Sequence, residues 1–242
     1  MAHYPKAPIT EAVIDIKVKV REELTLEQLL HVHSGEEERY PKKQIRWALH
    51  AEVTAGAQLA TASMQQPIGH QFVSGDGKQV AQVRLDGFTF SKLSPYDRWE
   101  SFRDEAKRLW TLYRNNARPS AIIRLAVRYI NRIDIPLPVN DFKEFLRTVP
   151  EVSSDMAQGL ARYFMQLQVP LEDVQALLIL NEAMIEPAHP GCVSVVLDLD
   201  ISRDQSVPSE ENEIWDFFEK LRSKKNDIFE ACITDKTRRL FV

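Results

Sequence analysis

Cysteine and long apolar runs are scarce in this chain of 242 residues. Its two cysteines, Cys192 and Cys232, lack the CxxC or Cys/His spacing of a metal site, and they argue against a disulfide framework and for a reducing compartment. The longest apolar run, Ala176 to Leu180, is far shorter than a membrane span. The N-terminal residues lack the basic start and apolar core of a signal peptide. We therefore expect a soluble cytoplasmic protein.

Recognised catalytic and metal-binding motifs are also missing. The sequence contains no GxSxG, HExxH or paired-carboxylate motif, and Gly75-Asp76-Gly77-Lys78 is not followed by the helix of a phosphate loop. The side chains of His31 and His33 diverge if both lie on one short helix, and no third metal ligand accompanies them. No set of residues indicates an enzymatic reaction, and we expect no cofactor or metal.

The overall charge argues against a surface that is uniformly positive. Hydrophobic residues at 44% and charged residues at 27% are ordinary for a globular protein. The net charge is −4 and the pI is about 5.9. These values leave room for a local basic face.

The stretch Ile122–Ile135, reading IIRLAVRYINRIDI, is the clearest strand. Its odd positions are apolar apart from Asn131, and its even positions carry Arg124, Arg128 and Arg132. Successive side chains of a strand point to opposite faces, so one face should pack on a core and the other should present three guanidinium groups. We expect Asn131 to hold a neighbouring loop such as the segment from Pro5 to Pro8, because a buried amide needs hydrogen-bond partners.

Alternating apolar residues predict further strands, and three- and four-residue spacing predicts helices. The expected strands are 12–20, 44–54, 69–74, 79–85, 88–93, 160–169, 174–184 and 192–201, with Ile45 and Trp47 facing inward. Glycine-containing turns at 75–77 and 86–87 separate three of them. Thr25 and Gln28 form a capping box for a helix at 25–32. Long amphipathic helices follow Ser94-Pro95 and Pro208, and a short one is expected at Phe142–Val149.

The order of these elements repeats in the two halves of the chain. The halves 1–118 and 119–242 each read as β-α-β(3–4)-α, and Trp99-Glu100-Ser101-Phe102 matches Trp215-Asp216-Phe217-Phe218. The predicted fold is therefore α+β, with one curved antiparallel sheet, two long helices on one face, and a tandem duplication. This arrangement resembles the fold of the TATA-binding protein. A helix-grip fold, in which the sheet wraps one helix around an apolar cavity, is the alternative.

Several short motifs also keep their order along the chain. They are Tyr4-Pro5 with Pro8-Ile9 and Glu11-Ala12, Tyr96-x-x-Trp99, Arg128-Tyr129-Ile130-Asn131-Arg132-Ile133, and Ile233-Thr234-Asp235. Together they resemble a sporadically distributed family of uncharacterised bacterial proteins of about this length. The resemblance implies no established activity, and the patchy occurrence of that family suggests genes of a phage-defence or toxin–antitoxin locus.

Basic residues at the predicted non-core positions form the candidate site, for nucleic acid or another polyanion. They are Lys17, Lys19, Arg46, Arg84, Arg124, Arg128, Arg132 and Arg162, with Gln82, Gln166 and Gln168 as further hydrogen-bonding groups. Guanidinium forks suit phosphates, whose neutralisation supplies most non-specific nucleic-acid affinity. The competing interpretation pairs these arginines with Asp15, Glu52, Asp134 or Asp198 on adjacent strands. Asp198-x-Asp200 would then pair with arginines and not hold Mg²⁺.

The predicted role is a non-enzymatic binding or adaptor module. Two alternatives stay open: a surface for a protein partner from a neighbouring gene, and a helix-grip cavity for a small apolar or anionic ligand. Dimerisation through an exposed edge strand is also compatible with an antiparallel sheet.

Overall fold

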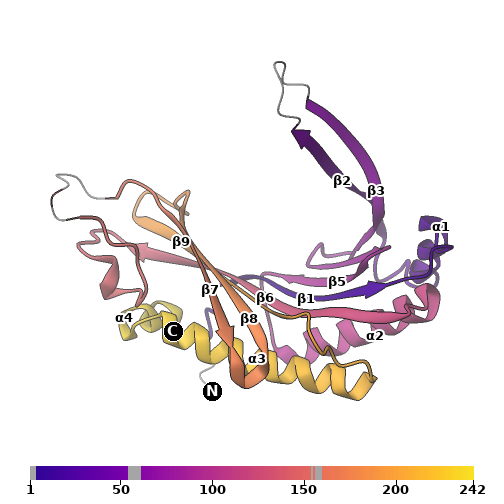
Figure 1. The fold of residues 1–242 in the computed structure, drawn as a ribbon. Coiled ribbons are helices and arrows are strands. Elements are labelled where there is room, and N and C mark those ends of the chain that lie inside the picture. The colour runs from indigo at the N-terminus through magenta and orange to yellow at the C-terminus, as the bar shows by residue number, and fades with distance from the viewer. Residues whose placement is uncertain (1–3, 54–60, 154, 156–159) are drawn as a thin grey trace. The chain divides into compact units, whose positions relative to one another are not determined.

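The computed structural model describes residues 4–53, 61–153, 155 and 160–242, and side chains at 48–53 and 61–65 are outside this description. Nine strands form one sheet in the order β2-β3-β4-β5-β1-β6-β9-β8-β7 (Figure 1). All of the strand pairs whose register is resolved are antiparallel. The strands are β1 Ile9–Lys19, β2 Lys42–Val53, β3 Thr61–Val73, β4 Gln79–Arg84, β5 Gly87–Leu93, β6 Ala121–Pro136, β7 Phe164–Leu171, β8 Ala176–Ile185 and β9 Cys192–Arg203. The predicted α+β class with an antiparallel sheet is confirmed.

Within this description the helices are two short and two long. They are α1 Leu26–Leu29, α2 Trp99–Ala117, α3 Glu211–Cys232 and α4 Asp235–Arg238, with short 3-10 turns at Leu30–His33, Phe142–Glu144, Glu172–Val174 and Arg239–Phe241. The predicted capping box is present, since the Thr25 hydroxyl accepts from the Gln28 N–H and the Gln28 side chain accepts from the Thr25 N–H. No helix in the described ranges is long and apolar enough to cross a membrane.

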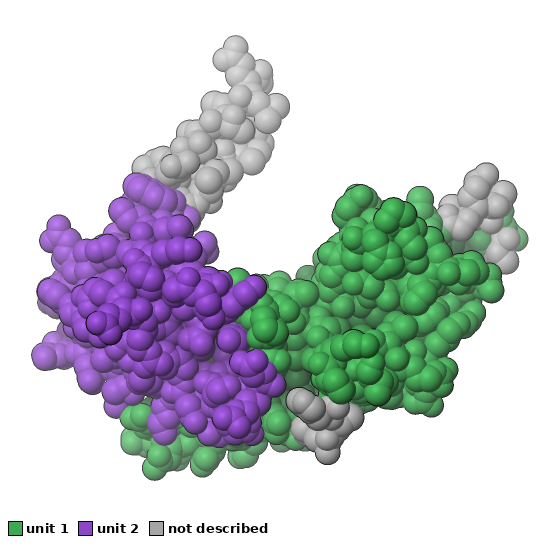
Figure 2. Space-filling view, turned by 180° about the vertical axis from the view of Figure 1, so that it is seen from behind, with its two compact units in different colours: residues 1–14, 93–96, 124–242 green, residues 15–92, 97–123 purple. Residues whose placement is uncertain are grey.

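The chain forms two compact units (Figure 2). Unit 1 comprises residues 1–14, 93–96 and 124–242, and unit 2 comprises residues 15–92 and 97–123. Strands β1 and β6 each contribute residues to both units. These units reflect which residues contact each other in space. The predicted repeats 1–118 and 119–242 would reflect a duplication of the sequence, which the units do not test and which stays a prediction.

The core of unit 2 lies between α2 and one face of its strands. The predicted helix stripe is buried, including Phe102, Trp110 and Tyr113. The ring of Phe88 lies 6.1 Å from that of Trp110, and the ring of Phe90 lies 5.5 Å from that of Phe102. Burying such large side chains stabilises the packing by about 1.5–3 kcal/mol each, so α2 is held mainly by this one apolar stripe.

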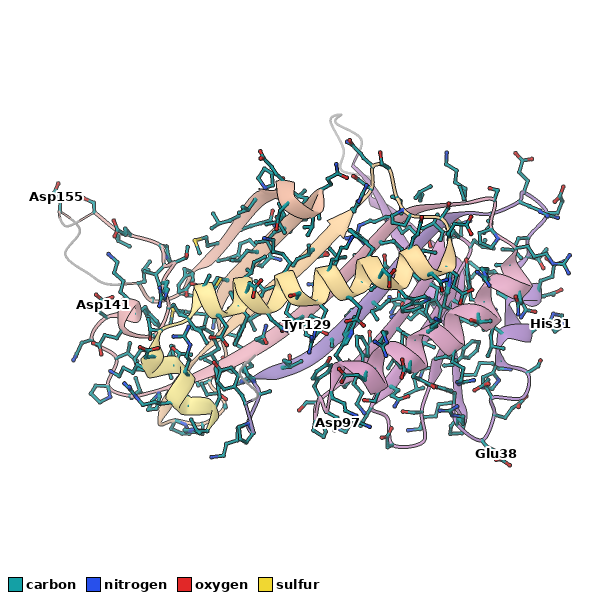
Figure 3. The ribbon with its side chains drawn as sticks, turned by 90° about the horizontal axis from the view of Figure 1, so that it is seen from below. His31, Glu38, Asp97, Tyr129, Asp141 and Asp155 are labelled. Atoms are coloured by element: carbon teal, nitrogen blue, oxygen red, sulfur yellow. The ribbon has the colours of Figure 1, made fainter. Side chains whose placement is uncertain are left out.

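The core of unit 1 lies between α3 and the odd-numbered face of β6. Leu125, Val127, Tyr129 and Ile133 are fully buried, as predicted, and α3 runs along this face (Figure 3). At the start of the strand, however, Ile123 is 36% exposed. The Asn131 amide donates to the carbonyls of Tyr129 and Leu197 on the same and the neighbouring strand. The predicted bond from Asn131 to the segment Pro5–Pro8 is therefore wrong.

The predicted helix over Phe142–Val149 is also wrong. Only Phe142–Glu144 forms a 3-10 turn, which Asp141 caps through the Lys143 N–H. Beyond it the backbone pairs with the chain that follows α3: Leu146 bridges Ile233, and the Arg147 N–H donates to the Cys232 carbonyl at 2.8 Å. These tertiary hydrogen bonds replace the helical ones that the local spacing favoured.

The burial predicted for β2 is not observed at Ile45 and Trp47, which are 53% and 52% exposed, although Ile45 pairs with the buried His70 and so lies on the core side of the sheet. Strand β2 is the terminal strand of the sheet, and α1 packs on β3 and β4, one strand short of it. An alternating pattern predicts which residues share a face, but it does not predict whether a helix reaches that face.

Candidate polyanion-binding face

One face of the sheet in each unit packs on a helix, and we call the opposite face the open face of that unit. The eight basic residues predicted as a site divide between the two units. Arg124, Arg128, Arg132 and Arg162 belong to unit 1, whereas Lys17, Lys19, Arg46 and Arg84 belong to unit 2. The two groups differ in how their charges are paired.

The β6 arginines of unit 1 are ion-paired. The Arg128 Nε and Nη2 atoms donate to both carboxylate oxygens of Asp198 at 2.8 and 2.7 Å, and Asp198 is 4% exposed. The guanidinium of Arg124 lies 3.2 Å from Asp200. The interpretation that Asp198 and Asp200 pair with arginines is confirmed.

Arg132 is bound in the same way at the other end of β6. Its Nε donates to Asp134 at 3.0 Å, and its Nη2 donates to the Glu186 carbonyl and the Ser194 hydroxyl. Burial raises the pKa of Asp134, but hydrogen bonds from Ser194 and Arg132 outweigh it and hold that pKa below its usual value. Arg162 lies outside the strands and makes only an exposed 3.9 Å pair with Glu186.

A hydrogen-bonded chain crosses the open face of unit 1 from β6 to β7. Asp198 accepts from Arg128 and from the Asn181 amide at 3.0 Å, and Asn181 accepts from the Gln166 amide at 2.8 Å. We call these four side chains the polar track. The carboxylates of Asp134, Asp198 and Asp200 oppose the three β6 arginines one for one, so this face has no excess of positive charge.

In unit 2 a different arrangement crosses the open face. Strand register places Arg46 beside Gly69, Gly69 beside Arg84, and Arg84 beside Gly87. A Cβ on Gly87 would lie 3.1 Å from the Cα of Lys17 on the next strand, so Lys17 continues the line. We call Arg46, Gly69, Arg84, Gly87 and Lys17 the basic row.

The two glycines of the basic row are required by their neighbours. A Cβ on Gly69 would lie 2.2 Å from the Val83 carbonyl oxygen, and one on Gly87 would lie 2.4 Å from that of Ile16. Gly87 also has φ +156°, a conformation that side-chain-bearing residues rarely adopt. The row therefore alternates basic side chains with positions that carry no side chain.

Arg84 anchors the middle of the row and is not available to a ligand. Its guanidinium donates to Asp86 at 2.8 Å, to Asp15 at 3.1 Å and to Thr89, and its side chain is 12% exposed. Asp15, one of the carboxylates that the competing interpretation named, is therefore paired with an arginine, although Arg84 lies two strands away and not on the adjacent strand. The side chains of Lys17, Lys19 and Arg46, by contrast, have no ion-pair or hydrogen-bond partner among the residues described here.

Residues beyond the predicted set extend this face. Register puts Lys42, Gln44, Gln71 and Gln82 on the same side as Arg46 and Arg84. Lys42 was missed because the alternating pattern was read from Gln44, two residues inside the true start of β2. Of the other acidic partners considered, Glu52 has a side chain outside the described residues. Basic residues thus outnumber Asp15 and Asp86 on the described part of this face.

Two of the described histidines, His33 and His70, take structural roles. The rings of His33 and His70 pair with the carbonyls of Tyr40 and Leu26 at 2.7 and 2.8 Å. No three His, Cys, Asp or Glu side chains in the described part of the chain lie close enough together to hold a metal ion.

A pocket of about 510 Å³ lies in unit 1. Residues 139–143, 149–152, Leu160 and Tyr163 line it. The Tyr163 hydroxyl donates to Glu182 at 2.8 Å, and Glu182 is 1% exposed. Burial raises the pKa of Glu182 to about 7, with the Tyr163 hydrogen bond opposing the rise.

We expect Glu182→Gln to stabilise the protein above neutral pH. The pKa of Glu182 is raised on folding, so its favourable contribution is complete below about pH 4.5 and is lost as the pH rises through 7. Glutamine keeps an acceptor for Tyr163 but no charge. Urea unfolding should show a gain of up to about 3 kcal/mol at pH 8 and almost none at pH 4.5. Equal gains at both pH values would contradict a buried titrating carboxyl.

Comparison of the chain with protein-family models, with curated proteins and with solved structures yields no match. The family resemblance noted from the sequence motifs stays a prediction.

Proposed function

We propose that this protein is a non-enzymatic nucleic-acid-binding module that contacts phosphates through the open face of unit 2. The observation that supports this function is the presence of unpaired basic side chains in the basic row and directly beside it. Lys17, Lys19 and Arg46 have no internal carboxylate partner in the described structure, whereas the arginines of β6 do. A ligand phosphate can therefore neutralise the unit 2 residues without first breaking an ion pair.

The spacing of the row suits an extended polyanion. Adjacent strands lie about 4.8 Å apart, so Arg46 and Lys17 are separated by about 20 Å, with the internally paired Arg84 midway between them. The fixed Arg84 guanidinium holds the strands in register, and Lys17 and Arg46 flank it. Open-face positions of β4 and β5 carry Gln82 and the buried Thr89 and Ser91 but no aromatic ring, which favours backbone contacts over base stacking.

The finer features of the fold belong to the same proposal. A tandem duplication resembling the TATA-binding protein would provide two related open faces, of which one has kept unpaired basic residues. A place in a phage-defence or toxin–antitoxin locus is compatible with a module that binds nucleic acid without reading its sequence.

A protein partner is the second candidate, and the polar track favours it. Arg128 is held by Asp198 yet its side chain is 45% exposed, and Gln166 ends the track at the last strand of the sheet. An electrically balanced face with ordered hydrogen-bonding groups is typical of protein interfaces.

The nucleic-acid proposal is tested by the salt dependence of binding. Fluorescence anisotropy with a short labelled DNA duplex should show binding at about 50 mM salt that weakens steeply by about 200 mM. Three phosphate contacts predict a slope of log K against log salt of about −3. Competition by unlabelled duplexes of unrelated sequence should be equally effective. A folded protein that does not bind at the lower salt concentration would exclude this function.

A further inference from the structure

In the part of the chain that the structure describes, the outer edge of β7 has little of the protection usual for edge strands, and its single proline, Pro170, lies next to the last residue of the strand. β7 is the last strand in the sheet order, and its sequence FMQLQVPL contains no charged residue. Natural edge strands are usually protected by charged side chains, bulges or covering elements. The other edge strand, β2, has such protection: Lys42, Lys43 and Arg46 lie on it, and its register with β3 shifts next to Trp47.

Large apolar side chains on β7 are exposed. Phe164 is 69% exposed and Val169 is 40% exposed. Pairing with β8 places Met165, Leu167 and Val169 on the side of the buried Leu178 and Leu180, and Gln166 and Gln168 on the open face. The strand therefore presents Met165, Leu167 and Val169 on one side, and the uncharged amides on the other side together with Phe164.

The direction of the unpaired backbone groups follows from the β7–β8 ladder. The Met184 N–H donates to the Tyr163 carbonyl at 3.1 Å. The backbone N–H and C=O groups of the odd-numbered β7 residues therefore face β8. Those of Gln166 and Gln168 consequently face outward. Pro170, which has no N–H, also falls on the outward side, near the end of the strand.

We propose that β7 pairs antiparallel with β7 of a second copy of this chain, about a twofold axis at Leu167. The outward backbone groups of Gln166 then meet those of the partner's Gln168, and the reverse pair forms by symmetry. Met165 lies beside the partner's Val169, and Leu167 lies beside its own copy. Amides thus face amides and apolar side chains face apolar side chains on both sides of the joined sheet.

A register shifted by two residues towards the C-terminal end of β7 is less favourable. A twofold axis at Gln168 would place Pro170 opposite the partner's Gln166 and remove two hydrogen bonds from the middle of the ladder. With the axis at Leu167, Pro170 meets only the partner's Phe164 at the end of the pair. A closed twofold interface of this kind also satisfies both edges at once.

This inference concerns unit 1 alone and is independent of the proposed nucleic-acid site. Its test is sedimentation equilibrium of the full chain and of two paired variants. The proposed register opposes position 166 to position 168 of the partner. Gln166→Lys with Gln168→Lys therefore sets like charges against each other twice, whereas Gln166→Lys with Gln168→Glu sets opposite charges against each other twice.

We expect the wild-type chain to be a dimer, the double-lysine variant to dissociate with a Kd raised at least about tenfold, and the lysine–glutamate variant to remain a dimer. Both variants alter exposed side chains, and circular dichroism checks that they are folded. A monomeric wild-type chain overturns the proposal. A double-lysine variant that dimerises as tightly as wild type overturns it as well, because the interface would then lie elsewhere.

Discussion

Replacing Lys17, Lys19 and Arg46 together by alanine should lower the affinity for duplex DNA by about 100-fold at low salt. Each residue lies on the open face of unit 2 without a described internal partner, so its removal deletes a phosphate contact and leaves no buried carboxylate behind. The slope of log K against log salt should become less negative by about three. Anisotropy titrations at several salt concentrations measure both quantities.

The matched control removes the same charge from unit 1. Arg124→Ala, Arg128→Ala and Arg132→Ala delete three arginines whose charges Asp200, Asp198 and Asp134 already balance. Binding should be retained by this variant, once circular dichroism shows that it is folded. The opposite result, with binding lost in the unit 1 variant and kept in the unit 2 variant, would move the site to β6.

Replacing Lys225 by methionine should stabilise the protein at pH 6 by about 3 kcal/mol. Lys225 on α3 is 8% exposed, and its Nζ lies 3.9 Å from the ring centre of Tyr129, which faces α3 on β6 (Figure 3). Burial, and then the charge of Arg222, lower the pKa of Lys225 to about 7, while Glu230 acts in the opposite direction. Methionine fills similar space without a charge, at the loss of a cation–π contact worth about 1–2 kcal/mol.

The pH dependence separates charge burial from packing. Because folding lowers the pKa of Lys225 from 10.5 to about 7, the contribution of this residue is most favourable above pH 10.5 and is lost as the pH falls through 7. The gain from Lys225→Met should therefore shrink to less than about 1 kcal/mol at pH 10. Urea unfolding at both pH values measures the change in unfolding free energy. Lys220→Met, on the exposed side of α3, is the control for replacing a lysine that is not buried. A variant less stable than wild type at pH 6 would show that the amine is a net stabilising contact.

Much of the fold was predictable because it follows from local spacing. The alternation in Ala12–Val20 and Ile122–Ile135 predicted β1 and β6, since a period of two fits only a strand with one buried face. The apolar stripe from Trp99 to Tyr113 predicted α2 in the same way. The helix predicted for Phe142–Val149 is absent because the backbone of this segment pairs with Cys232 and Ile233. These partners are about 85 residues away in sequence, and local spacing does not reveal them.

The candidate site was predicted only as a set of residue types. Alternation correctly put Arg124, Arg128 and Arg132 on one face of β6, but the charge on that face also depends on Asp200 and Asp198 of β9, which pair with Arg124 and Arg128. Which arginine is neutralised is decided by strand order, because cross-strand partners come from segments distant in sequence.

The sequence by itself determined most of the strands, the two long helices, the buried stripe of each helix and the face on which the basic residues of β1, β4 and β6 lie, because these follow from periods of 2 and 3.6 residues. Only the tertiary structure decided that β7 is an uncharged edge and that Arg46, Arg84 and Lys17 fall in one row across neighbouring strands. Register and strand order arise from packing among distant segments, and that packing decides which charges remain free to meet a ligand.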